Sequence, residues 1–174
     1  MKTLPKLIIT DIDGVWTDAG MYYSTSGEEL KKFNTYDSAG ILFCKLLKIP
    51  VCIITGENIN VVERRAKKLN IDYLFMGISD KVKVAEELIK KIGISWEDVA
   101  FLGDDINDME LLKKVGTPAV VASAPEYIKS LTDFITQKGG GEGAFREFVE
   151  TILLENNKMN EALELYHQSK KYKQ

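Results

Sequence analysis

Two groups of carboxylates follow apolar runs in this sequence: Asp11 with Asp13, and Asp104 with Asp105 and Asp108. A carboxylate at the end of a buried strand is costly unless a cation or a hydrogen-bond donor pairs with it. Acids that share one edge of a fold also repel one another unless a hard divalent cation and a lysine neutralise them. Because all the candidate donors are oxygens, we expect this cation to be Mg²⁺.

Further polar groups follow two other apolar segments. Thr55, Gly56 and Glu57 end one of them, and Lys81 follows Asp80 at the start of a helical pattern. Taken singly, each group has an ordinary explanation as a turn or a helix cap. Those explanations do not account for the joint arrangement, so we interpret the whole set as a candidate site.

Strands and helices must bring these residues together. Five short runs rich in Val, Ile, Leu and Phe, without polar alternation, are typical of parallel strands covered on both faces. We expect them at residues 7–10, 51–55, 73–75, 99–102 and 119–122. Apolar residues three and four apart predict helices at residues 38–47, 58–69, 81–91 and 105–114. This order predicts an α/β fold whose ligands bind beyond the carboxyl ends of the strands.

The stretch after the first expected strand departs from this alternation. Residues 21–23 and 28–33 flank a turn that contains Gly27, which predicts an antiparallel hairpin overhanging the site. Near the other end of the chain, residues 139–143 are rich in glycine and precede a last helix, expected at residues 144–154.

The composition fits one compact domain with an appendage. The 174 residues are 45% hydrophobic and 28% charged, with a net charge of −3 and interspersed signs, which argues against nucleic acid or an anionic membrane as a partner. No apolar run approaches the ~20 residues that cross a bilayer, so we expect a cytoplasmic protein. We expect residues 1–154 to form a single domain and residues 155–174 to be a helical or frayed extension.

Histidine and cysteine offer little for chemistry. His167 is the only histidine, and Cys44 and Cys52 lie in apolar surroundings without a metal-binding spacing. A histidine-based triad or a zinc site is therefore not expected. Acid–base chemistry must rest on carboxylates or lysines.

The polar groups form an ordered set of motifs. In chain order they are D-I-D-G, I-T-G, D-K and G-D-D-I-N-D. This set resembles the four motifs of the haloacid dehalogenase superfamily of phosphatases, over residues 6–150. The resemblance implies a Rossmann-like fold with a parallel sheet, helices on both faces and a β-hairpin flap after the first strand. Only short segments separate the motifs, so no cap domain fits between them.

A nearer resemblance is to the capless branch that includes 3-deoxy-D-manno-octulosonate (KDO) 8-phosphate phosphatases and relatives acting on nine-carbon keto-sugar acid phosphates. It is carried by D-I-D-G-V-W-T-D-A-G, K-F-N-T-Y-D-S-A-G, T-G-E-N, R-R-A and, at residues 140–147, G-G-x-G-A-F-R-E. In that branch, hairpins of four subunits form a central barrel and the glycine-rich segment reaches an adjacent active site. The resemblance therefore implies a homotetramer whose sites are completed by neighbouring subunits.

The same resemblance implies roles for three aspartates. Asp11 would be the nucleophile that takes the phosphoryl group as an aspartyl phosphate, and Asp13 would protonate the leaving oxygen and then activate water. Two residues along an extended strand return a side chain to the same face, so both carboxylates can address one phosphate. An Asp11 oxygen, the Asp13 backbone carbonyl and Asp104 would hold Mg²⁺.

Phosphate-binding and supporting roles follow in the same way. Thr55 and the Gly56 amide, at a helix start, would bind phosphate oxygens. Lys81 would offset the negative charge of the nucleophile and of the transferring group. Supporting roles in the metal's water shell, at the lysine or at the substrate fall to Asp105, Asn107 and Asp108, for which helix capping is an equal alternative.

Substrate selection needs other residues, because a capless site lacks a lid of its own. A sugar acid carboxylate would suit Arg65 or Lys68, although a solvated basic face explains them equally well. Glu57 would repel the carboxylate of an eight-carbon acid and accept hydrogen bonds from a hydroxylated or amino-bearing substrate. We therefore favour a 9-phosphate of the deaminated-neuraminate (KDN) type over KDO 8-phosphate. The other expected substrate-binding residues are Asn34, Thr35, Asp37 and Ser38.

Two other classes of protein carry similar features. A signalling receiver domain also combines an acceptor Asp, acidic metal ligands, Thr and Lys on a parallel sheet. Its acceptor lies on the third strand, however, and here residues 73–75 lead into Met76 and Gly77 without a carboxylate. The second alternative is a non-catalytic homologue that forms an oligomeric platform beside a sugar-activating enzyme. All motif positions are occupied, which favours an enzyme.

Overall fold

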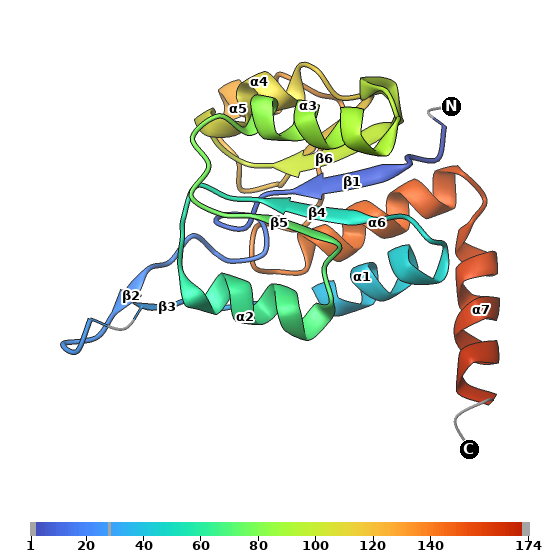
Figure 1. Cartoon of the computed structure of the whole chain (residues 1–174), viewed down its shortest axis with the longest axis horizontal. Helices are drawn as coiled ribbons and strands as arrows, with labels where there is room; N and C mark the ends of the chain where they lie inside the picture. The colour runs from blue at the N-terminus through green and yellow to red at the C-terminus, as the bar shows by residue number, and fades with distance from the viewer. Residues whose placement is uncertain (1–2, 28, 172–174) are drawn as a thin grey trace.

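Five parallel strands form the centre of the protein (Figure 1). The computed structural model describes residues 3–27 and 29–171, apart from the last two side chains of that range. The strand order is β5–β4–β1–β6–β7, with β1 in the middle. The bounds are β1 (Leu7–Thr10), β4 (Val51–Ile54), β5 (Tyr73–Phe75), β6 (Val99–Gly103) and β7 (Thr117–Val120). Thr10 is in register with Ile53 and Leu102, so three neighbouring strands end together.

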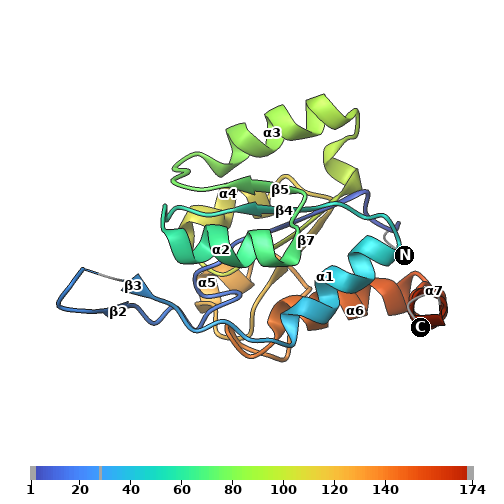
Figure 2. The same ribbon diagram turned by 60° about the horizontal axis from the view of Figure 1, so that its bottom comes forward.

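Helices cover both faces of this sheet (Figures 1 and 2). On one face lie α1 (Asp37–Leu46), α2 (Asn60–Leu69) and α6 (Ala144–Glu155), and on the other lie α3 (Lys81–Ile92) and α4 (Met109–Leu112). Every residue of β1 and β4 is buried, because side chains on both faces of these strands meet helices. The expected Rossmann-like α/β fold is confirmed. Shorter elements are α5 (Glu126–Lys129) and 3₁₀ turns at Trp96–Asp98 and Ile106–Asp108.

The last strand begins two residues earlier than its apolar run indicated. β7 covers Thr117–Val120, and its first two residues pair with Ala100 and Phe101. The second of them is Pro118, which lacks an N–H donor. The pairing tolerates it because β7 is the edge strand of the sheet.

The helix expected at residues 105–114 is divided in two. A 3₁₀ turn at Ile106–Asp108 precedes the four-residue α4. The Asp108 carboxylate accepts hydrogen bonds from the backbone N–H groups of Asp104 and Asp105, at 2.8 and 3.4 Å. Such side-chain bonds to nearby backbone compete with regular helix, which explains the tight turn at this position.

The expected hairpin projects from the body of the molecule (Figures 1 and 2). β2 (Tyr22–Tyr23) pairs in antiparallel fashion with β3 (Glu29–Leu30). At the base of the hairpin, Thr17 and Phe33 form a further antiparallel bridge. Within the described residues, which leave out Glu28, the two strands are shorter than expected, and the described chain around them is largely irregular.

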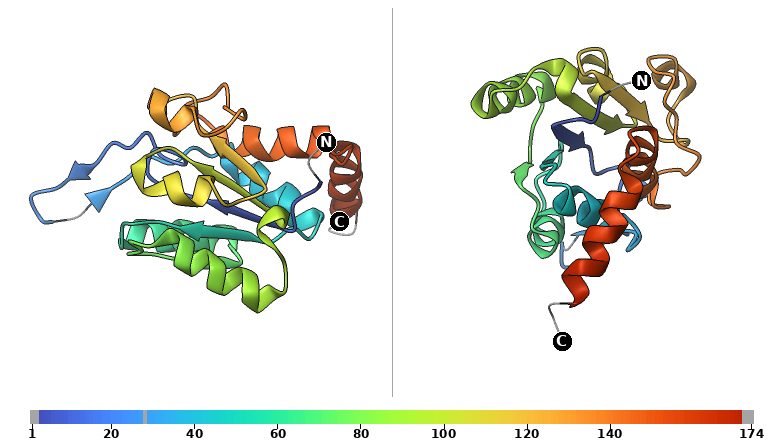
Figure 3. Two further views of the ribbon diagram at one scale, coloured as in Figure 1. Left: turned by 90° about the horizontal axis from the view of Figure 1, so that it is seen from above. Right: turned by 90° about the vertical axis from the view of Figure 1, so that its right-hand side faces the viewer.

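The C-terminal part of the chain is helical. α7 (Met159–Lys171) lies across the ends of α1 and α6 (Figure 3), with Ala162 fully buried. Residues 172–174 of the expected extension lie outside the described residues. The division into a domain at 1–154 and an extension stays a prediction. Among the described residues, no helix combines the length and hydropathy that a bilayer crossing requires.

Candidate active site

The carboxyl ends of β1, β4 and β6 form a small acidic cavity. Asp11 follows β1, Thr55 follows β4 and Asp104 follows β6, so the strand register brings them together. The cavity has a volume of about 150 Å³, and it is lined by Asp11, Asp13, Ala19, Met21, Lys31, Thr55, Gly56, Glu57 and Asn107. Several of the residues expected from the sequence therefore lie together at one site.

A buried lysine links carboxylates that follow two different strands. Lys81 is the first residue of α3, and its Nζ lies 2.8 Å from Asp11 Oδ2 and 2.7 Å from Asp108 Oδ1. Burial alone would lower the pKa of Lys81, but the two carboxylates outweigh it and raise the pKa. The lysine is therefore held as a cation beneath the cavity.

The Asp11 carboxylate is oriented by donors on both oxygens. The Ile12 N–H donates to Asp11 Oδ1 at 2.7 Å, while Lys81 holds Oδ2. Burial, together with the charge of Asp108, raises the pKa of Asp11 to about 7 against the lowering effect of Lys81. The single positive charge of Lys81 thus does not offset the energetic cost of burying these carboxylates close together.

Asp104 shows where a further cation fits. Burial and the charges of Asp108 and Asp11 raise its pKa to about 8. Its buried Oδ1 has no hydrogen-bond partner among the described residues. Carboxylate oxygens of Asp11, Asp104 and Asp108 lie within 4.8 Å of one another. An oxygen-only cluster with an unsatisfied acceptor fits a hard divalent cation.

Gly14 makes room for Asp104. A Cβ atom at this position would lie 1.8 Å from Asp104 Oδ2, and its backbone φ is +79°. Any other residue would therefore both clash with the carboxylate and strain the turn. The glycine of D-I-D-G is thus required by the geometry of the acidic cluster.

Asp13 faces the same cavity but takes no part in that cluster of carboxylate oxygens. Lys31 Nζ lies 2.5 Å from Asp13 Oδ1. Sequence reasoning missed Lys31, because the motifs do not include it. A signal was available: residues alternate in extended chain, so Glu29, Lys31 and Phe33 share one face of the hairpin segment, opposite Leu30.

The residues after β4 line the cavity from another side. Thr55 is buried, with its Oγ1 accepting from the Glu57 N–H at 3.4 Å, whereas Gly56 and Glu57 are exposed. The expectation that Gly56 stands at a helix start is wrong, since α2 begins only at Asn60. Ile59, directly before the helix, has extended φ and ψ angles and packs against the core.

Apart from Lys81, which lies beneath the cavity, six expected substrate-binding residues lie outside it: Asn34, Thr35, Asp37, Ser38, Arg65 and Lys68. Arg65 Nη2 donates to the Asn34 carbonyl at 3.1 Å and to Ser38 Oγ at 3.0 Å, which ties this loop to α2. Asp37 is fully buried, and its Oδ1 accepts from the Arg146 N–H at 3.1 Å. Thr35 and Lys68 are exposed. A role in substrate binding stays a prediction for all six.

The glycine-rich segment packs against its own chain, and its expected reach to a neighbouring active site stays a prediction. The Gly141 N–H donates to the Val15 carbonyl at 3.1 Å, and Asn34 Nδ2 donates to the Gly141 carbonyl at 3.0 Å. A Cβ on Gly140 would lie 1.9 Å from the Gly14 carbonyl oxygen. The glycines are therefore explained by close packing against the turn that carries Asp13.

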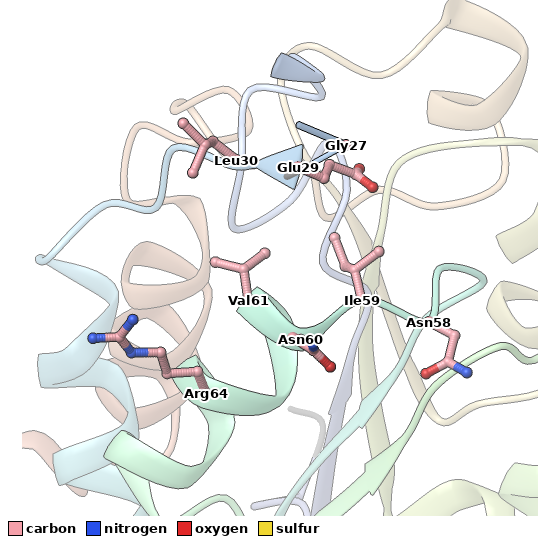
Figure 4. A pocket seen from close by; sticks show the side chains of 8 residues that line it. All are labelled: Gly27, Glu29, Leu30, Asn58, Ile59, Asn60, Val61 and Arg64. Atoms are coloured by element: carbon pink, nitrogen blue, oxygen red, sulfur yellow. The ribbon is translucent and has the colours of Figure 1, made fainter. Parts of the chain in front are cut away.

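A second, larger hollow lies between the hairpin and the start of α2 (Figure 4). Its volume is about 570 Å³, and it is lined by Gly27, Glu29, Leu30, Asn58, Ile59, Asn60, Val61 and Arg64. Figure 4 shows Ile59 and Val61 directed towards the hairpin. Among the described residues, this hollow thus separates part of the hairpin from the start of α2.

Comparisons with known proteins agree with this geometry. A profile of haloacid dehalogenase-like hydrolases matches residues 74–147. The KDO 8-phosphate phosphatase KdsC of Escherichia coli strain K12 is 40% identical over 157 residues, which are 90% of this chain and 84% of KdsC. A crystal structure of a probable YrbI family phosphatase from Pseudomonas syringae pv. phaseolica 1448a matches with a TM-score of 0.91 at 39% identity, covering 95% of this chain and 94% of that chain.

A third relative extends the comparison. The KDO 8-phosphate phosphatase of Moraxella catarrhalis, in complex with a magnesium ion, a phosphate ion and a KDO molecule, has a TM-score of 0.90 at 34% identity, covering 95% of each chain. The resemblance drawn from the motifs is confirmed by these matches. This chain therefore belongs to the KDO 8-phosphate phosphatase family of haloacid dehalogenase-like hydrolases and is a phosphoric monoester hydrolase.

Proposed function

We propose that this protein is a magnesium-dependent phosphatase that hydrolyses a keto-sugar acid phosphate through an aspartyl phosphate. The observation that carries the proposal is the cluster of Asp11, Lys81 and Asp104 beneath a cavity that Asp13 and Thr55 also line. The Moraxella catarrhalis relative, whose crystal holds magnesium, phosphate and a keto-sugar acid, supports it.

Asp11, Asp104 and the Asp13 carbonyl would hold Mg²⁺. The unsatisfied Asp104 oxygen and the proximity of the carboxylates support this set. Asp108 offers a further oxygen in the cluster, but Lys81 and the Asp104 N–H already occupy its carboxylate. When bound, the ion would supply a Lewis acid that reduces repulsion between the nucleophile and the phosphate.

The residues of this chain account for both chemical steps. In the first, Asp11 attacks phosphorus, the bond from phosphorus to the sugar oxygen breaks, and Asp13 gives that oxygen a proton. In the second, Asp13 takes a proton from water, whose oxygen bonds to phosphorus and displaces the Asp11 carboxylate. Thr55 and Lys81 stabilise the negative charge on the phosphoryl oxygens throughout.

We favour the nine-carbon KDN 9-phosphate over KDO 8-phosphate as the substrate. Support comes from Glu57, which is exposed and lines the cavity beside Thr55. A negative charge there disfavours the carboxylate of the eight-carbon acid and suits hydroxyl groups; in the nine-carbon acid the carboxylate lies one carbon further from the phosphate. Measuring kcat/KM with Mg²⁺ on both phosphates tests this preference, and higher efficiency on KDO 8-phosphate would reverse it.

Variants at position 57 sharpen that test. Glu57→Gln removes the charge, so the efficiency ratio should move towards KDO 8-phosphate. Glu63→Gln is the matched control, because Glu63 is an exposed glutamate of α2 outside the cavity. An unchanged ratio in Glu57→Gln would exclude Glu57 as the selecting residue.

We further propose a homotetramer in which neighbouring subunits complete each site. A cavity of about 150 Å³ accommodates a phosphate but is smaller than the roughly 300 Å³ at the lower end for small-molecule pockets. The sugar must therefore lie against another surface. Light scattering coupled to size-exclusion chromatography measures the subunit number, and a monomer with full activity on a sugar acid phosphate would contradict this proposal.

A further inference from the structure

Lys31 is a cation in the cavity that the motifs leave unexplained. It comes from the hairpin segment directly after β3, and its side chain is 0% exposed. Its Nζ lies 2.5 Å from Asp13 Oδ1 and 3.9 Å from Glu29 Oε1. The next residue, Lys32, is exposed and pairs with Asp18 at 3.2 Å. Two adjacent lysines therefore differ sharply in burial and in what they contact.

The two oxygens of Asp13 are unequal as a result. Oδ1 accepts a hydrogen bond from Lys31 Nζ. It also lies 3.4 Å from Oγ1 of Thr17, which is fully buried. Oδ2 is a buried atom with no hydrogen-bond partner among the described residues. A buried acceptor without a partner is costly. The arrangement thus leaves one defined oxygen of Asp13, a residue that lines the cavity, with unused hydrogen-bonding capacity.

We propose that Lys31 is a positioning residue for Asp13. By holding Oδ1, it leaves Oδ2 as the oxygen that exchanges protons with the reacting groups. This inference rests on the proposed acid–base role of Asp13. In the first step the Oδ2–H bond breaks as the leaving oxygen gains the proton, and in the second step water returns a proton to Oδ2, so the group is restored after each turnover.

The position of Lys31 links this function to the hairpin. Lys31 is anchored at the inner end of the hairpin segment, while the outer hairpin projects away from the body. The hairpin therefore contributes to the chemistry through Lys31, in addition to any surface that it offers to substrate.

A comparison of leaving groups separates positioning from a general loss of structure. p-Nitrophenolate leaves without a proton at neutral pH, whereas phenolate, a stronger base, gains more from protonation. With Mg²⁺ present, Lys31→Met should lower kcat/KM for phenyl phosphate about 10-fold more than for p-nitrophenyl phosphate. Lys32→Met, the adjacent matched control, should leave the ratio of the two efficiencies unchanged.

A double-mutant cycle with Asp13→Asn completes the test. If Lys31 acts through Asp13, the ratio of the two efficiencies in Asp13→Asn should not change further when Lys31→Met is added. Lys31→Arg should restore much of the ratio, because it retains a cation that can bond to Asp13. Equal losses on both aryl phosphates, no loss, or a further change in the double variant would overturn the proposal.

Aryl phosphates make this test independent of the natural substrate. The wild-type enzyme's preference between sugar acid phosphates does not enter the ratio. A wild-type protein that hydrolyses neither aryl phosphate would count against the proposed chemistry as a whole. Thermal unfolding of Lys31→Met shows whether the variant is folded. If it is not, the ratio of the two efficiencies in Lys31→Arg decides the test.

Discussion

The floor of the active site and the hairpin above it are built in opposite ways. The floor, defined here as Asp11, Lys81, Asp104 and Asp108, consists of buried or partly buried side chains fixed by contacts within one chain. Among its described residues, the outer hairpin has only two paired positions on each strand, and it exposes apolar side chains. These are Met21, Tyr22, Tyr23 and Leu30, which are 44–69% exposed.

This difference separates chemistry from selection. Catalysis of phosphoryl transfer requires groups held rigidly before the substrate arrives, and the contacts within the floor meet that requirement for its four residues. Exposed apolar side chains on a projecting hairpin are instead typical of surfaces that bind a partner. Changes in the floor should therefore affect every substrate, whereas changes in the outer hairpin should affect the sugar acid phosphates selectively.

The largest effect is expected at the nucleophile. Asp11→Asn should lower kcat on p-nitrophenyl phosphate and on sugar acid phosphates alike by roughly 10⁴-fold or more, because no other floor carboxylate can take its place. Steady-state kinetics with Mg²⁺ measures the loss. Asp18→Asn, a change at an exposed aspartate of the same loop, should remain active, and substantial turnover by Asp11→Asn would remove the covalent mechanism.

Removal of the cation comes next. Chelation by EDTA should reduce activity to background, and added Mg²⁺ should restore it. Mg²⁺ should also raise the melting temperature, because a ligand that binds only the folded state stabilises it.

Asp104→Asn offers a test of the same site that does not depend on turnover. This variant should gain stability in EDTA, since one of the crowded carboxylates is lost, and should lose the Mg²⁺-dependent rise in melting temperature. Scanning calorimetry of both proteins, with and without Mg²⁺, provides the measurement. An equal Mg²⁺ response in the variant would exclude Asp104 as a ligand.

The hairpin should respond differently. Replacing Tyr23 and Leu30 together by Ser should lower kcat/KM on a sugar acid phosphate by about 100-fold, because binding energy remote from the phosphate is lost. Turnover of p-nitrophenyl phosphate should change little. Tyr127→Ser, at another exposed tyrosine, is the control. Parallel losses on both substrates would show that the hairpin serves the chemistry as a whole.

Sequence reasoning brought Asp11, Lys81 and Asp104 of the floor to one place because their positions follow from local patterns, and it left the role of Asp108 open. Apolar runs placed Asp11, Thr55 and Asp104 at strand ends, and the parallel register then required them to meet. The motif order added Lys81 at the first position of α3, where its ion pairs place it in the structure. These predictions needed little knowledge of long-range contacts, which the sequence does not reveal.

The parts that sequence reasoning missed depend on tertiary packing. Lys31 reaches Asp13 only because the hairpin returns over the first loop, a path that no local pattern specifies. The close fit of Gly140 against Gly14 of the same chain is a second contact that the motif order did not predict. Such close approaches between segments far apart in sequence are set by the assembled fold and not by residue spacing.

A buried acid outside the floor gives the last and smallest expected effect. Asp37 is fully buried at the start of α1, and burial raises its pKa from 3.8 to about 6, outweighing the Arg146 N–H, Arg65 and Lys138. The folded state therefore binds a proton more tightly than the unfolded chain. The free energy of unfolding should therefore fall as the pH rises from about 4 to 6. Above that range it should be lowered by the full cost of ionising the buried carboxyl.

Asp37→Asn isolates this cost. The amide oxygen can still accept from the Arg146 N–H, so the variant should unfold with a free energy about 2–3 kcal/mol higher than wild type at pH 7.5. At about pH 4 the difference should nearly vanish, because the native carboxyl is then protonated. Urea unfolding at both pH values measures it, with the exposed Asp133→Asn as control. An Asp37→Asn variant that is less stable than wild type at pH 7.5 would contradict this expectation. It would mean that the negative charge of Asp37 stabilises the fold. Asp37, at the loop of residues 34–38, would then differ from the floor carboxylates, which are costly to bury without a cation.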